Sequence, residues 1–137
     1  MGMNYGDINW IAILACVIAG QVFLTLWFAV LFGEPWAKAY GAADKAQHTK
    51  EIPGYTYGIG ALCVLLVSLG LAVLQKALVT TTLGGAIGLG VFVAIHFCIA
   101  TAVPGYAFLR RWSACALAVG SQVVLIVLLS VILVLFG

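Results

Sequence analysis

The chain has 137 residues, of which 65% are hydrophobic and only 7% are charged, and its mean hydropathy is +1.22. An average soluble domain carries roughly a quarter charged residues, so this composition excludes a water-soluble globular protein. The net charge is +2, and the six basic residues are too few and too scattered for a nucleic-acid site. We therefore expect the lipid bilayer, and no nucleic acid, as a partner.

The apolar residues fall into four blocks, at about residues 8–32, 57–75, 82–103 and 112–136. Each block is near the roughly 20 residues with which a helix crosses a hydrocarbon core about 30 Å thick. The blocks lack the alternation of β-barrel strands, and in lipid only a helix satisfies its own backbone hydrogen bonds. The first block also lacks the basic region of a secretory signal, so we expect it to be retained. The sequence predicts one all-α domain, residues 1–137, with four transmembrane helices in a bundle.

The connection after the first span begins with Gly33, Glu34 and Pro35. Glycine ends many helices, and proline is pre-set for the first turn of a new one. An interfacial segment is therefore predicted at about residues 35–47, as a short helix lying along the membrane surface; the alternative is a plain polar loop. Four aromatic residues are expected as anchors at the membrane interface: Trp27, Trp36, Tyr40 and Trp112.

The third span is predicted to end at a second corner, Pro104-Gly105-Tyr106, which is followed by aromatic and basic residues. The basic residues are divided unequally among the connections. One of them, Lys76, lies in the second connection, and five lie in the first and third: Lys38, Lys45, Lys50, Arg110 and Arg111. The positive-inside rule then predicts that the first and third connections are cytoplasmic and that both termini are on the outer side.

Three stretches of the sequence carry a resemblance to a known family: Asn9-Trp10, the aromatic stretch from Trp27 to Trp36, and the run from Gly90 to Gly120. The chain resembles a small bacterial four-span family that is known as domain of unknown function 1761. The resemblance implies a compact four-helix protein of the bacterial inner membrane. It supplies no catalytic residues.

Three polar residues are expected at one depth near the middle of the bilayer: Gln21, His96 and Gln122, each from a different span. Such residues commonly hold helices together by hydrogen bonds. They could instead form a site for a small solute or a proton, or contribute a ligand to a metal or cofactor. Since no second strong donor accompanies His96, we expect no metal and no cofactor.

Small residues recur at intervals of four in three spans and predict close helix packing, with Gly20, Gly84, Gly88 and Gly120 as the main positions. A ridge left facing outward would dock a second copy or a larger complex. The four cysteines, one in each span, are expected as free apolar fillers. The aliphatic run at residues 123–136 predicts a last span that faces lipid or a partner.

The sequence contains no nucleophile beside a base in an aqueous loop and no phosphate-binding glycine motif, so no enzyme is predicted. We predict instead an accessory or self-assembling structural subunit of a membrane complex in the bacterial inner membrane. Its partners would be copies of itself or other membrane-protein subunits. The alternative is a small-solute or proton transporter or channel that works as an oligomer through Gln21, His96 and Gln122.

Overall fold

The computed structural model describes residues 5–39, 41, 44, 46–47, 50 and 52–137. Four helices in this part are long and apolar enough to cross a membrane: Trp10–Leu31, Tyr55–Ala77, Leu83–Leu109 and Trp112–Phe136. The described residues contain no strand. The predicted all-α fold with four apolar helices is confirmed. Two predicted site residues, Tyr40 and Lys45, lie outside the described residues.

Two of the four spans consist of consecutive helical segments. The first span combines α1 (Trp10–Thr25) with the π-helical segment η1 (Leu26–Leu31). The third combines α5 (Leu83–Val93), the π-helical segment η2 (Ala94–Ile99) and α6 (Ala100–Leu109). The second span is α4 (Tyr55–Ala77), the fourth is α7 (Trp112–Phe136), and the short helix α2 (Gly33–Ala39) follows the first span. π-Helical turns are rare and often occur at functional positions.

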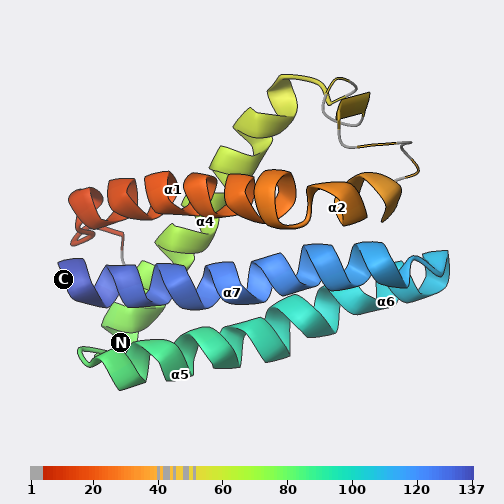
Figure 1. Ribbon diagram of the computed structural model, residues 1–137. Coiled ribbons are helices and arrows are strands. Elements are labelled where there is room, and N and C mark those ends of the chain that lie inside the picture. The colour runs from red at the N-terminus through yellow and green to blue at the C-terminus, as the bar shows by residue number, and fades with distance from the viewer. Residues whose placement is uncertain (1–4, 40, 42–43, 45, 48–49, 51) are drawn as a thin grey trace.

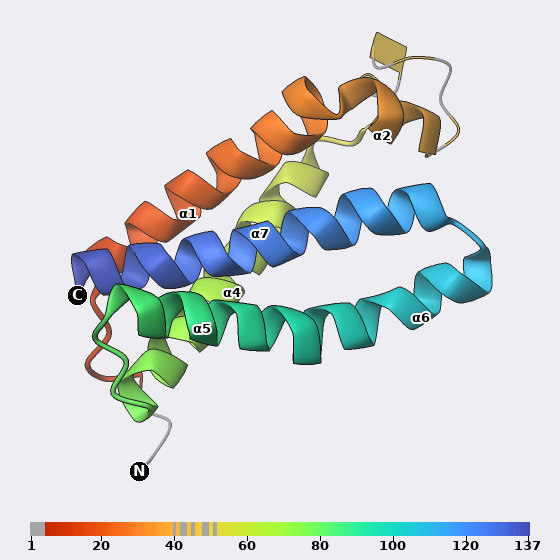
Figure 2. The ribbon, with the colours of Figure 1, turned by 60° about the horizontal axis from the view of Figure 1, so that its bottom comes forward.

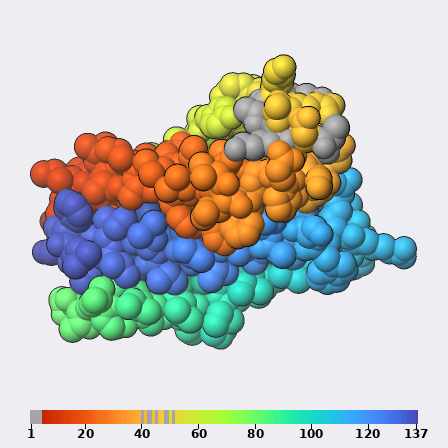
Figure 3. Space-filling model, in the orientation of Figure 1, coloured from red at the N-terminus to blue at the C-terminus, as the bar shows by residue number. Residues whose placement is uncertain are grey.

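Helix α7 is the centre of the bundle. It lies between α1 and α5, and α4 crosses behind it at an angle (Figure 1, Figure 2). In the space-filling view α7 fills the strip between α1 and α5 (Figure 3). In its most apolar window 39% of the residues are buried, against 17–22% in the other spans.

The prediction that the last span faces lipid or a partner is therefore wrong. Leu125, Leu129 and Leu133, at intervals of four, are all buried in the core. The physical reason is that lipid tails are as apolar as a bundle interior. A helix that is aliphatic on every side is compatible with either position.

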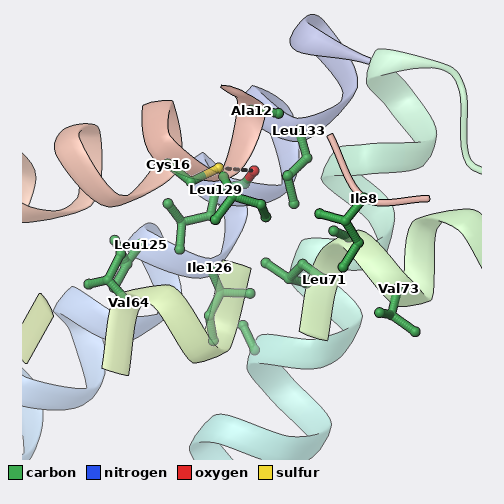
Figure 4. Close-up of a cluster of buried hydrophobic side chains, with 13 residues drawn as sticks. Ile8, Ala12, Cys16, Val64, Leu71, Val73, Leu125, Ile126, Leu129 and Leu133 are labelled. Carbon is green, nitrogen blue, oxygen red and sulfur yellow. Dashed lines mark hydrogen bonds between the residues drawn. The ribbon is translucent and has the colours of Figure 1, made fainter. Parts of the chain in front are cut away.

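The largest group of buried side chains joins α1, α4 and α7. Val64 and Leu71 of α4 lie close to Leu125 and Leu129 of α7, while Cys16 of α1 donates a weak hydrogen bond from Sγ to the Leu129 carbonyl oxygen, at 3.7 Å (Figure 4). All four cysteines are free. Cys16 and Cys115 are buried, Cys98 is half-buried, and Cys63 is exposed, so a filler role inside the bundle does not extend to Cys63.

Glycines mark the closest approaches between helices. A Cβ built on Gly20 would lie 2.6 Å from Cγ1 of Val64 on α4, and one built on Gly90 would lie 2.9 Å from Cα of Val127 on α7. At Gly120 the nearest atom would be Cζ2 of Trp27 at 3.4 Å, an ordinary contact. At Gly84 and Gly88 no such atom lies within 4 Å, so neither residue packs inside the chain.

The internal ridge of α5 is a different set of small residues. Ala86, Gly90 and Ala94, again at intervals of four, are the buried ones, and both alanines are fully buried. Because a helix has 3.6 residues per turn, residues 84 and 88 lie on another face than residues 86 and 90. α5 therefore carries two small-residue ridges, of which one faces α7 and one faces outward.

The predicted corner at Pro104 is wrong, because α6 continues through Pro104 to Leu109. The chain turns instead at Arg110, whose φ of 56° is left-handed. Proline is tolerated in membrane helices where π-turns and Ser or Thr side chains adjust the freed backbone groups. Both features precede Pro104: η2 ends at Ile99, and the Thr101 hydroxyl donates to the Phe97 carbonyl oxygen.

The first corner also differs in detail from the prediction. The chain bends at Phe32, whose φ is −124° and ψ is 26°, and Gly33 is the first residue of α2.

Trp27 is half-buried, and its indole Nε1 donates to the Leu117 carbonyl oxygen on α7 at 3.1 Å. This side chain therefore joins two spans. Trp36 is half-buried against Phe28, with ring centroids 5.1 Å apart, and Trp112 is 60% exposed.

The two ends of the bundle are fixed by contacts between distant parts of the sequence. At one end Nη1 of Arg111 lies 3.5 Å from the Ala39 carbonyl oxygen, so the first and third connections are adjacent. At the other end Nδ2 of Asn9 donates to the Phe136 carbonyl oxygen at 2.9 Å. The start of α1 and the end of α7 therefore lie together, as expected for an even number of crossings.

Candidate functional site

The three polar residues expected at the middle of the membrane do not interact with one another in the described part of the chain. Gln21 donates from Nε2 to the Tyr57 carbonyl oxygen on α4, at 3.2 Å. His96 is exposed on η2 and stacks on the Phe92 ring, with centroids 4.4 Å apart. Gln122 is half-buried on α7. In the described part of the chain, no hydrogen bond joins any two of Gln21, His96 and Gln122.

A polar cluster that the sequence analysis missed connects three spans. Nε2 of Gln75 on α4 donates to the carbonyl oxygen of Ser130 at 2.8 Å and to its hydroxyl oxygen at 2.9 Å. The Ser130 hydroxyl on α7 in turn donates to the Ala86 carbonyl oxygen on α5, at 2.7 Å. Gln75 is 7% exposed and Ser130 is fully buried. We call Gln75, Ser130 and Ala86 the amide–hydroxyl cluster.

A signal for this cluster was present in the sequence. No partner was predicted for Gln75, which is the last residue of the predicted span at residues 57–75 and lies beside Lys76. However, Ser68, Leu71 and Gln75 are spaced three and four residues apart, as residues on one helical face are. All three are buried. A polar residue that continues a buried stripe predicts a partner in a neighbouring helix.

A cavity of about 380 Å³ lies beside this cluster, where α1 begins and where α4 and α7 end. This volume is within the range of roughly 300–1,000 Å³ that is typical of small-molecule sites. Its walls are mostly apolar and include Ala12, Ala72 and Leu133. Its polar lining comes from Asn9, Gln75, Lys76, Thr80 and Thr81. The combination of apolar walls with a few polar groups is typical of a site for an amphiphile.

The orientation of the Gln75 amide is determined by its hydrogen bonds. The Ser130 carbonyl oxygen can only accept, so the atom that faces it must be Nε2. Oε1 of Gln75 then has no hydrogen-bond partner among the described residues. A buried acceptor without a partner costs free energy, which a ligand with a hydrogen-bond donor would recover.

The end of α4 positions the remaining polar groups of the cavity. The Val79 amide donates to the Lys76 carbonyl oxygen at 3.2 Å, and the Thr80 amide donates to the Gln75 carbonyl oxygen at 2.8 Å. These two bonds form the Schellman motif, which requires a left-handed residue that is usually glycine. Here that residue is Val79, with a φ of 53°, which is strained for a β-branched side chain. The turn holds Thr80 and Thr81 at the cavity.

Asn9 closes the cavity from the side of α1. Its Oδ1 accepts hydrogen bonds from the amides of Ile11 and Ala12, which makes it the N-cap of α1. Its Nδ2 donates to Phe136, as described above. Asn9 therefore fixes the start of α1 against the end of α7 beside the cavity.

Among the described residues that line the cavity there is no His, Cys, Asp or Glu, the usual ligands of transition metals. Among the described residues, no group of three or more His, Cys, Asp or Glu side chains is placed to hold a metal ion. The polar lining residues offer an ammonium group from Lys76, hydroxyls from Thr80 and Thr81, and side-chain amides from Gln75 and Asn9.

Comparisons with curated proteins and with solved structures gave no match. A comparison with family models gave a match to the family described as "Protein of unknown function (DUF1761)", over residues 11–134. The matched region includes all four spans almost completely, together with the amide–hydroxyl cluster. The resemblance predicted from the sequence is confirmed, and the chain belongs to the DUF1761 family.

Proposed function

We propose that this chain is a non-enzymatic, multi-pass membrane protein that assembles with copies of itself as a structural subunit of a membrane complex. The contact surface would be the outward side of α5 and η2, which we call the α5 outer face: Gly84, Gly88, Phe92 and His96. The observation that carries the proposal is the position of His96. Its ring is exposed and stands in the middle of the 27-residue third span.

An exposed His96 is costly in a hydrocarbon environment. Nδ1 lies 3.0 Å from the Phe92 carbonyl oxygen, which can only accept, so in a neutral ring Nδ1 carries the hydrogen. Nε2 is then an acceptor, and it has no hydrogen-bond partner within the described residues. Histidines inside a membrane almost always face a protein interior or a water-filled cavity. This supports a second protein surface that covers His96.

The glycines of the same face support a second copy as the occupant. Gly84 and Gly88 form a G-x-x-x-G pair with open space around both positions. Such pairs let two identical membrane helices approach closely. Copies in one membrane share their orientation, so a two-fold axis along the membrane normal brings α5 beside α5. Phe92, which is 52% exposed, would be covered in the same contact.

The substitution Gly88→Leu tests the α5 outer face. We expect it to weaken self-association at least tenfold, because a bulky side chain separates the two helices. The fold of each subunit should remain, since nothing lies near this position within the chain. The measurement is sedimentation equilibrium in a mild detergent, or counting of labelled subunits in single nanodiscs.

The matched control is Gly70→Leu, because Gly70 is also exposed in a span and has open space around it, but lies on α4. This variant should associate as the wild type does. A wild-type protein that stays monomeric at membrane-like concentrations would contradict the proposal, and so would equal association of the Gly88 variant and the wild type.

We further propose a location in the bacterial inner membrane, with the first and third connections in the cytoplasm and α2 along the membrane surface. The contact between Arg111 and Ala39 supports this arrangement, because it places the end of α2 beside the start of α7, at the same end of the bundle. Reporter tags fused to either terminus in bacterial cells should be accessible from the outer side. Labelling of either tag only after the membrane is opened would contradict this orientation.

The alternative of a transporter or channel receives less support. It requires Gln21, His96 and Gln122 to line one path, whereas the hydrogen bonds of Gln21 and His96 lead to separate backbone groups.

A further inference from the structure

The cavity at the junction of α1, α4 and α7 offers a set of groups that self-assembly does not use. We propose that it binds a phosphate ester that carries a free hydroxyl group. Such a ligand can be the headgroup of an anionic lipid, as in phosphatidylglycerol, or a soluble glycerophosphate. The inference is independent of the α5 outer face, because no residue of that face lines the cavity.

Lys76 supplies the positive charge for the phosphate. Among the described residues that line the cavity, it is the one with a charged side chain. It is exposed and has no ion-pair partner in the described part of the chain. Lys76 is also the penultimate residue of the 23-residue helix α4, which brings it to the depth of lipid phosphates when the helix spans the bilayer.

Gln75 selects for the hydroxyl group. Its Nε2 is engaged by Ser130, so the polar atom left for a ligand is Oε1, which accepts hydrogen bonds and cannot donate them. The ionised oxygens of a phosphate diester cannot satisfy this acceptor, whereas the alcohol hydroxyl of a ligand can. The hydroxyls of Thr80 and Thr81, which also line the cavity, are available as donors to phosphate oxygens.

The walls and the charge of the cavity define what it excludes. Ala12, Ala72 and Leu133 provide an apolar surface for the glycerol backbone and the first carbons of an acyl chain. A choline headgroup has no hydroxyl to donate to Gln75, and its positive charge would face Lys76. Phosphatidic acid carries the phosphate but lacks the hydroxyl. These lipids therefore separate the roles of the two residues.

The test uses the full chain in detergent, with binding measured by native mass spectrometry or by the shift of the thermal unfolding midpoint. Four probes are compared: phosphatidylglycerol, phosphatidic acid, phosphatidylcholine and soluble glycerol phosphate. We expect phosphatidylglycerol to bind at least tenfold more tightly than phosphatidylcholine and several-fold more tightly than phosphatidic acid. Binding of glycerol phosphate alone with equal affinity would identify the soluble ester as the ligand.

The substitution Lys76→Gln should weaken binding of phosphatidylglycerol about tenfold, since it removes a charge-assisted hydrogen bond. The control is Lys38→Gln, which removes an equally exposed lysine from the opposite end of the bundle and should change little. The Lys76 side chain makes no hydrogen bond to the described residues, so we expect the variant to fold. The inference is overturned if phosphatidylcholine binds as well as phosphatidylglycerol, if both lysine variants behave alike, or if phosphatidic acid equals phosphatidylglycerol.

Discussion

Gly90→Leu is expected to lower the free energy of unfolding by about 3 kcal/mol, at the upper end of the usual cost of overpacking. A Cβ at this position would lie 2.9 Å from the Cα of Val127, 3.3 Å from its Cγ2 and 3.4 Å from the Cβ of Ser130. The nearest of these atoms belongs to the backbone, so no rotamer change relieves the contact and α5 must move away from α7. The measurement is unfolding of the purified protein in detergent, followed by circular dichroism.

Gly70→Leu is the control for this prediction, because it places the same side chain in open space in a span. It should leave the free energy of unfolding within about 0.5 kcal/mol of the wild type, as surface substitutions usually do. Equal stability of the two variants would show that α5 and α7 are farther apart than the structure places them. Gly90→Ala should fall between the wild type and Gly90→Leu.

Gln75→Leu is expected to lower the free energy of unfolding by about 1–2 kcal/mol. The two side chains have similar length, so the main loss is that of two hydrogen bonds to Ser130, at 2.8 and 2.9 Å. Hydrogen bonds between membrane helices contribute about 0.6 kcal/mol on average and at most about 1.7 kcal/mol each. The same unfolding measurement in detergent gives the difference.

The matched control is Gln122→Leu, which makes the same exchange at a half-buried position of α7. It should change the stability by less than about 0.5 kcal/mol. A double-mutant cycle with Ser130→Ala isolates the pair, because each change should cost less in the presence of the other. Strictly additive effects, or a larger effect at Gln122, would speak against the amide–hydroxyl cluster.

The number of apolar helices could be predicted because each of the four apolar blocks is long enough to cross the bilayer as a helix. The path of the third span could not. Pro104 and Gly105 end helices in water, yet here a helix runs through both to Leu109. In lipid an interrupted helix leaves backbone groups without partners, so the chain keeps the helix and adjusts it with a π-turn.

Helix neighbours were harder to predict than helix positions. Gly84 and Gly90 are equally small, but only Gly90 meets α7, because the rotation of α5 about its axis is decided by packing and not by composition. Trp27 shows the same limit, since an amphipathic ring at a span end satisfies its N–H at the interface or, as here, at Leu117. The cavity was not predicted, because it depends on how three helix ends meet.

The central place of α7 affects how the protein can be made. Ribosomes deliver the spans in chain order, so α1, α4 and α5 enter the membrane before the helix on which all three pack. Until then Gly90 of α5 and Gln75 of α4 lack their partners on α7, although α1 and α4 can already pack on each other. The bundle is therefore complete only after its last span has been inserted. A chain interrupted before residue 112 would hold three spans but lack α7, the helix on which all three pack.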